Sequence, residues 1–270
     1  MKESKVIVAT RTNISGLSDC ITALEGMKDY ACIECFYVIC NKDKEECKVG
    51  NKAVHILPDS KPTRPTAFNT VLQALRENSK DSQAHLFTFS KEVMAEEKHI
   101  KAMLAKLTGT TLVVGYKLHD NVLSDKEYQI YSNMSQGESG IAYLVPWNTC
   151  AIWNSECILA GSSSGLWFDE ICESDSNQLG VLKIKIDGQE KETDYKGMED
   201  GLAIAHLLST DKFKDWKYKL IEGKPPKWII PDDLGNGAGQ RIKMARKNIV
   251  LSTFMNIRGY SIERLRQARL

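Results

Sequence analysis

Two adjacent carboxylates, Glu199 and Asp200, stand directly before apolar residues at helical spacing, from Leu202 to Leu208. Acidic residues at a helix start are common as caps, because they accept hydrogen bonds from free N–H groups and face the positive end of the helix dipole. A carboxylate on such a rigid first turn is also well held to take a proton from a substrate. The sequence therefore predicts a helix over residues 200–210 and leaves two roles open for its first turn, a cap and a general base.

Other motifs with a known chemistry are missing. The chain has no Gly-Lys-Ser/Thr phosphate loop, no Gly-x-Gly-x-x-Gly, no Gly-x-Ser-x-Gly and no His-Glu-x-x-His. Cys32 and Cys35 have the CxxC spacing, but no second pair follows, and the next residues, 36–40, are typical of a strand. We interpret both cysteines as small buried residues with reduced thiols.

Length and composition are those of an ordinary globular chain. The 270 residues are enough for one large domain or two small ones, and 36 basic residues balance 35 acidic ones. This balance gives no reason to expect nucleic acid as a partner. No apolar run approaches the ~20 residues of a membrane helix, and the apolar stretch near the N-terminus is too short for the core of a signal peptide. We expect no transmembrane segment and a cytoplasmic location.

The first half of the chain alternates strands with helices. Short apolar runs predict strands over residues 5–10, 33–40, 53–57, 84–89 and 111–115. Helical spacing lies between them, and a charged loop, residues 41–46, follows the second strand. The alternation predicts an α/β fold with a mostly parallel central sheet and helices on both faces. Ligands of such sheets bind where the strands end, so the loops that start at Thr10, Asn41 and Ser90 should line one crevice.

The second half is less regular. Residues 141–145, 149–153 and 181–186 have the pattern of strands with antiparallel pairing. The tail after Pro231 is basic and contains three glycines, which predicts a mobile loop and then a terminal helix from about Asn248. We therefore expect one α/β domain over residues 1–230 and a basic C-terminal loop and helix over residues 231–270.

The order of these parts resembles the inverting family-2 glycosyltransferases, which have the GT-A fold, over roughly residues 5–221. The similar segments are the strand that ends in Thr10-Arg11-Thr12-Asn13, the second strand from Phe36 to Asp43, the helix start Arg64-Pro-Thr-Ala67-Phe68-Asn69, the strand from Pro146 to Ile152, the turn Gly165-Leu-Trp-Phe168-Asp169-Glu170 and the Glu199-Asp200 helix. His206 stands where this family frequently has an arginine.

The resemblance implies transfer of a sugar, with inversion, from a nucleoside-diphosphate sugar to the hydroxyl of an acceptor, which is a glycan, a lipid or a protein. It makes Asp200 the general base that deprotonates the acceptor and gives Glu199 a positioning role. The residues that it assigns to binding are Thr10, Arg11, Asn41 and Asp43 for the nucleotide, Arg64 and Asn69 for the ribose and phosphates, and Trp147 and Asn148 for the acceptor side.

One motif of the family is replaced. Its fourth strand usually ends in Asp-x-Asp, which holds a divalent cation, Mn²⁺ or Mg²⁺, on the donor's diphosphate. The matching segment here is Ser90-Lys91-Glu92. Glu92 is the one acidic ligand left in it, whereas hard cations are held by several oxygens. The charge of the leaving diphosphate still has to be offset. The cationic candidates are Arg11, Arg64, Lys91, Arg241, Lys243 and Arg246.

Two other functions stay open. The altered Ser90-Lys91-Glu92 segment also fits a catalytically impaired protein that binds a nucleotide sugar without turning it over. A nucleotidyltransferase has a related α/β architecture, but the Gly-rich, basic loop that usually follows its first strand is missing.

Overall fold

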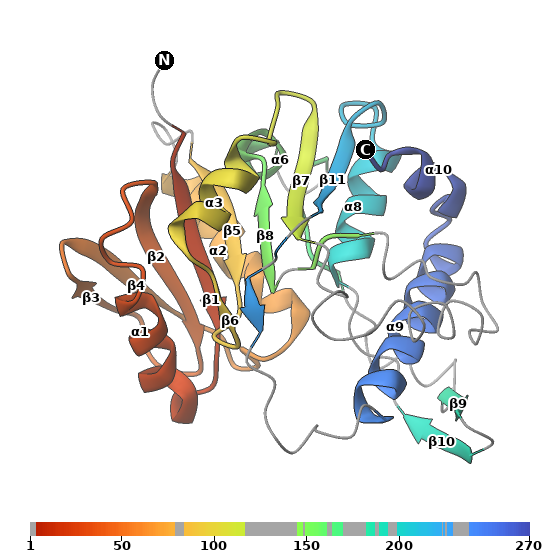
Figure 1. Ribbon diagram of the computed structural model, residues 1–270, viewed down its shortest axis with the longest axis horizontal. Helices are drawn as coiled ribbons and strands as arrows, with labels where there is room; N and C mark the ends of the chain where they lie inside the picture. Colours follow the sequence, from red (N-terminus) through yellow and green to blue (C-terminus); the bar gives the residue numbers. More distant parts are fainter. Residues whose placement is uncertain are drawn as a thin grey trace.

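The computed structural model describes residues 4–78, 84–116, 145–147, 149–160, 164–169, 182–186, 189–193, 199–222, 224, 226–228 and 238–270. At the centre is an eight-stranded sheet with the order β11-β7-β8-β5-β1-β2-β4-β3 (Figure 1). Its strands are β1 (Val6–Arg11), β2 (Ile33–Cys40), β3 (Glu45–Val49), β4 (Lys52–Pro58), β5 (His85–Phe89), β7 (Thr111–Tyr116), β8 (Cys150–Trp153) and β11 (Lys217–Ile221).

The sheet is mixed. β1 pairs in parallel with β2 and β5, β2 pairs in parallel with β4, and β11 pairs in parallel with β7. β8 lies antiparallel between β5 and β7, and β3 lies antiparallel to β4 at the edge. The predicted parallel sheet is therefore correct for β4, β2, β1 and β5. The second half adds a strand of opposite direction, β8, which confirms the antiparallel pairing predicted for residues 149–153.

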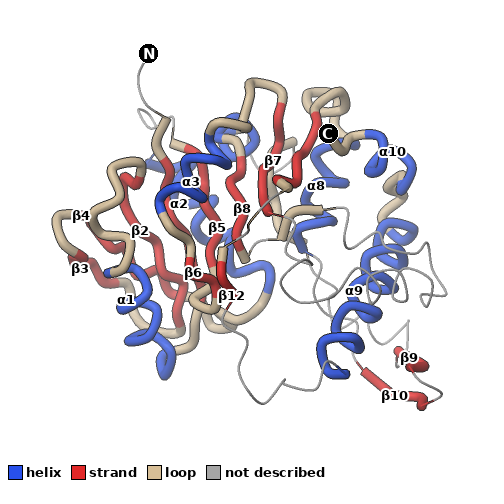
Figure 2. Tube along the Cα trace, in the orientation of Figure 1, coloured by secondary structure: helices blue, strands red, loops and turns tan. Residues whose placement is uncertain are grey.

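Helices cover both faces of this sheet, which explains why β1, β7 and most of β2 are continuous apolar runs. Figure 2 shows α1 (Leu17–Glu25) and α3 (Glu97–Leu104) in front of the strands. α2 (Phe68–Asn78) and α6 (Ser155–Leu159) contact each other and cover the opposite face. The turn between α1 and β2 is joined to the start of α3, because Ala31 N donates to Glu97 Oε1 at 2.9 Å.

The structure corrects the charged loop predicted over residues 41–46. From Glu45 onward the chain forms β3, which pairs with β4 at the edge of the sheet. Glu45, Glu46 and Lys48 of this strand are exposed, whereas Val49 is buried. Charged side chains are usual on edge strands, because they oppose pairing with another chain. The same charges make the segment look like a loop in the sequence.

The C-terminal helices reach the sheet through α8 (Glu199–Ser209), which contacts β7 and both later helices, α9 (Ala238–Ile257) and α10 (Ile262–Gln267). The start predicted for the terminal helix, near Asn248, is wrong, because α9 begins at Ala238 and includes Gly239 in its first turn. The chain end is tied to the edge strand β11: Tyr218 N donates to Ala268 O, and Leu270 N donates to Tyr218 O, both at 3.0 Å.

Two small sheets complete the described part. β9 (Leu182–Ile186) pairs antiparallel with β10 (Gln189–Thr193), which confirms the strand predicted over residues 181–186 and adds a second strand that the sequence pattern does not predict. β6 (Val93–Met94) pairs with β12 (Lys227–Trp228). The strand predicted over residues 141–145 lies, except for Val145, outside the described residues. Among the helices that the structure describes, none is both long and apolar enough to cross a membrane.

Candidate functional site

The sheet changes its direction of winding between β1 and β5. From β1 the chain moves to β2 and β4 on one side, whereas β5, β8 and β7 lie on the other. In open α/β sheets ligands bind at such a switch point, outside the carboxyl ends of the strands. We call the end of the sheet at which the parallel strands β1, β2, β4 and β5 finish the carboxyl edge. The start of β8 also lies there, because Ser90 N, just after β5, donates to Thr149 O at 3.1 Å.

An open pocket of about 520 Å³ lies at the carboxyl edge, where the loops that follow β1, β2 and β4 meet. Asn41 and Asp43, both predicted to hold the nucleotide, lie in its wall, where Asn41 Oδ1 accepts a hydrogen bond from Ile14 N at 2.7 Å. The complete lining is Ile14, Asn41, Lys42, Asp43, Pro58, Asp59 and Ser60. The side chains of Asn41, Asp43, Asp59 and Ser60 offer hydrogen-bonding groups to a small ligand in this space.

Asp59 and Ser60 are pocket residues that the sequence analysis missed. Asp59 N donates to Cys40 O at 2.9 Å, so the loop after β4 continues the pairing of β4 with β2. Asp59 Oδ1 accepts a hydrogen bond from Lys61 N at 2.7 Å, which fixes its carboxylate at the rim. The signal that could have found them is the strand predicted over residues 53–57. A strand parallel to β2 ends at the carboxyl edge, so the residues that follow it lie there too.

The predicted cationic residues Arg11 and Arg64 are neighbours. Arg11, the last residue of β1, donates from Nη1 to Arg64 O at 2.5 Å, and its guanidinium carbon lies 5.0 Å from the ring centroid of Phe68. Thr10, one residue earlier, is buried with 1% of its surface exposed. The structure thus brings Arg11 and Arg64 together between β1 and the start of α2, and it buries Thr10 within β1.

Asn69 has a different environment from the one expected beside a ribose. Its side chain is buried, and its amide group makes two hydrogen bonds with the main chain of Phe168, at 2.7 and 2.8 Å. These bonds hold the Gly165–Asp169 turn against α2. The contact that the structure gives Asn69 is therefore a structural one, and its predicted contact with the donor stays a prediction.

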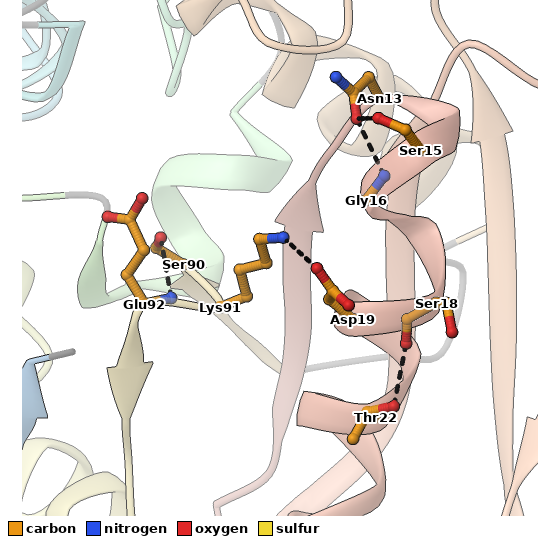
Figure 3. A network of polar contacts seen from close by, with 9 residues as sticks. All are labelled: Asn13, Ser15, Gly16, Ser18, Asp19, Thr22, Ser90, Lys91 and Glu92. Carbon is orange, nitrogen blue, oxygen red and sulfur yellow. Dashed lines mark hydrogen bonds and ion pairs between the residues drawn. The ribbon is translucent and has the colours of Figure 1, made fainter. Parts of the chain in front are cut away.

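The segment Ser90-Lys91-Glu92 follows β5 at the switch point (Figure 3). Lys91 Nζ lies 2.7 Å from Asp19 Oδ2 of α1, whereas the Glu92 side chain extends away from this ion pair. The hydrogen bond to Asp19 and the charge of that carboxylate raise the pKa of Lys91. Glu92 N donates to Ser90 Oγ at 3.4 Å, which closes the turn.

Glu92 is the one acidic residue of this segment, and the weak binding of a divalent cation expected from it stays a prediction. An ammonium group stands next to Glu92 in the sequence and would repel a cation bound there. Within the part of the chain that the structure describes, no group of three His, Cys, Asp or Glu side chains is arranged to hold a metal ion. Hard cations take six or more oxygen ligands, and Glu92 supplies at most two.

Trp147, predicted on the acceptor side, lies just before β8 at the carboxyl edge and is 9% exposed. Lys247 of α9 covers one face of its ring, with Nζ 3.9 Å from the ring centroid. This cation–π contact joins α9 to the carboxyl edge. Asn148, the other predicted acceptor residue, lies outside the described residues.

Asp200 is a buried carboxylate in the first turn of α8, with 3% of its surface exposed. α8 leads back into β11, which is parallel to β7, so its first turn lies at the carboxyl edge (Figure 1). Glu199 is the first residue of the same helix. The next residue, Gly201, packs directly on α9, because a Cβ atom there would lie 2.7 Å from Leu251 Cδ2. Close packing of two helices thus holds the backbone of Asp200.

A second polar cluster joins the Gly165–Asp169 turn to the C-terminal helices. Arg258 Nε lies 3.0 Å from Asp169 Oδ2, and His206 Nδ1 lies 3.3 Å from the hydroxyl of Tyr260. Burial lowers the pKa of His206, although the charge of Asp169 acts in the opposite direction. Asp169 and His206 belong to two separate sequence motifs, and their common neighbourhood with Arg258 and Tyr260 appears only in the folded chain.

The cysteines of the CxxC spacing are structural. Cys32 is buried just before β2 and Cys35 is half-buried within it, and the seven cysteines that the structure describes are free thiols. Burial raises the pKa of Cys35 to about 12 and also raises the pKa of Cys32. Such thiols are poor nucleophiles at neutral pH. This agrees with their interpretation as small packing residues.

Comparison with known proteins adds no relative. No protein-family model matches the chain, and no curated protein matches it. The assignment of a function therefore depends on the residues and the geometry described above.

Proposed function

We propose that this protein transfers a sugar, with inversion, from a nucleoside-diphosphate sugar to an acceptor hydroxyl. The observation that carries the proposal is the position of Asp200. Its buried carboxylate begins a helix at the same edge of the sheet as an open polar pocket and the neighbouring cations Arg11 and Arg64. The order and spacing of these parts resemble a GT-A-type glycosyltransferase, which is the finer fold assignment that we propose for the α/β sheet.

The donor would lie along the carboxyl edge. The pocket around Asn41, Asp43 and Asp59 has the carbonyl and carboxylate acceptors that the N–H groups of a nucleobase require. Arg11 ends β1 and Arg64 comes just before α2, and we assign their guanidinium groups to the diphosphate of a donor in the pocket. Two guanidinium groups match the geometry and charge of phosphate oxygens.

The reaction would need one proton transfer from the acceptor to the protein. As the acceptor oxygen forms its bond to the anomeric carbon, the bond from that carbon to the diphosphate breaks, and the acceptor proton passes to Asp200. Inversion places the base opposite the leaving diphosphate. This requirement fits a base on α8 rather than on the loop after β5. Burial of Asp200 keeps bulk water from competing for the proton.

A second function is favoured by a specific observation. Ser90 stands where the family has the first acidic residue of its metal-binding motif, and the next residue, Lys91, is paired with Asp19. This pairing fits a protein of the same fold that binds a nucleotide sugar without transferring it. The two proposals share the pocket and differ in the role of Asp200.

The test is a thermal-shift screen of nucleotide sugars and nucleoside diphosphates, followed by measurement of nucleoside diphosphate release with mixed acceptors. A ligand that binds only the native state raises the melting temperature by mass action. Binding with release of the diphosphate supports the transferase, and binding without release or hydrolysis supports the second function. If no nucleoside diphosphate binds at millimolar concentration, both proposals fail.

A further inference from the structure

The ion pair between Lys91 and Asp19 lies where the diphosphate of the proposed donor would pass. Lys91 follows β5, and Asp19 lies in the first turn of α1, which follows β1, so the two residues span the switch point of the sheet. Both side chains reach solvent, with 39% of the Lys91 side chain and 69% of the Asp19 side chain exposed. The pair is accessible to a ligand and is not part of the core.

The surroundings of the ammonium are shaped by a glycine. A Cβ atom on Gly16 would lie 2.4 Å from Thr12 Oγ1 and 3.4 Å from Lys91 Nζ. The third atom near this position is Asn13 Oδ1, at 3.3 Å, so these three polar groups border the space that a side chain at position 16 would fill. The missing side chain leaves room beside the ammonium, a group that suits phosphate oxygens.

The charges favour replacement of Asp19 by a diphosphate as the partner of Lys91. Asp19 and the ammonium make an exposed ion pair, which is worth little in water. A diphosphate carries more negative charge than one carboxylate and offers several acceptor oxygens to the same donor. The pKa of Lys91 is raised, chiefly by its hydrogen bond to Asp19, so the group is a cation at neutral pH.

We propose that Lys91 is the cation that binds the donor's diphosphate, in place of a divalent metal ion, and that Asp19 holds its side chain until the diphosphate displaces the carboxylate. This inference rests on the proposed function for its ligand. It explains why an ammonium follows β5 where an oxygen-rich metal site is absent from the described residues. It also gives Asp19 a role, because its carboxylate competes with the diphosphate for the ammonium of Lys91.

The test is isothermal titration calorimetry in EDTA with UDP and GDP, with the corresponding monophosphates, and with inorganic pyrophosphate. Lys91→Met should weaken diphosphate binding about 10- to 100-fold, the range for losing a hydrogen bond to a charged group, and should change monophosphate binding little. Asp19→Asn should tighten pyrophosphate and diphosphate binding by up to about fivefold, because it removes the competing carboxylate. Lys91→Arg should retain most of the affinity.

The matched controls are Lys214→Met and Asp211→Asn. Lys214 Nζ lies 3.4 Å from Asp211 Oδ1 in another exposed pair, which lies between α8 and β11 at the opposite edge of the sheet. Neither control should change binding, and melting temperatures will show that all variants fold.

The outcomes separate the two proposals. If nucleotides bind Lys91→Met as tightly as the unaltered chain, or if binding needs Mn²⁺ and is lost in EDTA, the inference about Lys91 fails while the proposed function stands. Pyrophosphate binding that depends on Lys91, without binding of any nucleotide, supports the ammonium site and overturns the proposed function. If neither pyrophosphate nor any nucleotide binds, both fail.

Discussion

Asn69 and Phe168 lie 99 positions apart in the sequence and are joined by a closed pair of hydrogen bonds: Asn69 Nδ2 donates to Phe168 O, and Phe168 N donates to Asn69 Oδ1. The ring of Phe168 lies 5.6 Å from that of Phe68 and 5.4 Å from that of Trp153, measured between centroids. The pair therefore fixes the turn that ends in Asp169 to both α2 and β8.

Asn69→Asp should destabilise the protein strongly. The aspartate still accepts a hydrogen bond from Phe168 N, but its second oxygen faces the Phe168 carbonyl, and the buried charge has no donor in place of the lost one. We expect the free energy of unfolding at pH 7 to fall by about 3 kcal/mol. Gln73→Glu makes the same change of amide to acid on the exposed side of α2 and should cost less than about 0.5 kcal/mol. Equal urea midpoints for the two variants would contradict the structural role of Asn69.

Asp200→Asn tests the proposed general base. The substitution nearly conserves shape and removes the charge that takes the proton. We expect turnover to fall about 10²- to 10⁴-fold, with donor affinity and melting temperature little changed. The control is Asp211→Asn, which lies just beyond the other end of α8 with a fully exposed side chain and should retain activity. A cap alone predicts the reverse pattern, a loss of about 1 kcal/mol in stability with the rate retained. That result would remove Asp200 from the mechanism.

Stability should fall as the pH is lowered from about 7 to about 5. Burial lowers the pKa values of His85, His99 and His206 below the ordinary value, so in this range the unfolded chain binds protons that the folded chain does not. Each histidine contributes a slope of at most about 1.4 kcal/mol per pH unit. Urea unfolding at several pH values measures the sum.

His99→Gln isolates one contribution. His99 Nδ1 accepts a hydrogen bond from Glu96 N at 3.1 Å in the capping box of α3, which requires the neutral ring. A glutamine at this position can accept the same bond and does not titrate. The variant should therefore keep its stability at pH 7 and show a flatter pH dependence. An unchanged pH slope would mean that His99 does not contribute.

Gly201→Ala should destabilise the contact between α8 and α9. The new Cβ atom would lie 2.7 and 2.8 Å from the two methyl carbons of Leu251, which is fully buried. Overpacking costs about 1–3 kcal/mol, which outweighs the gain of up to about 1 kcal/mol from better helix propensity. In a Leu251→Ala background the same substitution should cost little, and a double-mutant cycle measures that coupling. Gly109→Ala, with no atom within 4 Å of its new Cβ, is the control.

Much of the sheet could be predicted from the sequence, because buried strands leave a simple signal. β1, β2, β5 and β7 are mostly apolar, and the predicted bounds of each agree with the structure within one or two residues. The edge strands β3 and β11 are not predicted, because half of their residues are charged and neither strand is an apolar run. β11 does alternate between buried and half-buried positions, which is the signal that was available.

The site was predictable only in part, for a different reason. The loop after each parallel strand can be assigned to the carboxyl edge, which places the loop that starts at Asn41 there, and the family resemblance adds Asp43. Sequence pattern does not show which side chains from distant loops pair with each other. Lys91 and Asp19 are 72 positions apart, and His206 and Tyr260 are 54 apart, so their contacts appear only once the helices are packed.

The position of β8 has a consequence for synthesis of the chain on the ribosome. β8 lies between β5 and β7, yet its residues emerge after both of its neighbours have been made. Until Cys150–Trp153 has been synthesised, β5 and β7 each lack the strand with which one of their edges pairs in the folded protein. Open strand edges recruit strands from other chains. A product that stops before residue 150 is thus left with permanent open edges and will aggregate or require a chaperone, whereas the complete chain closes them with four residues.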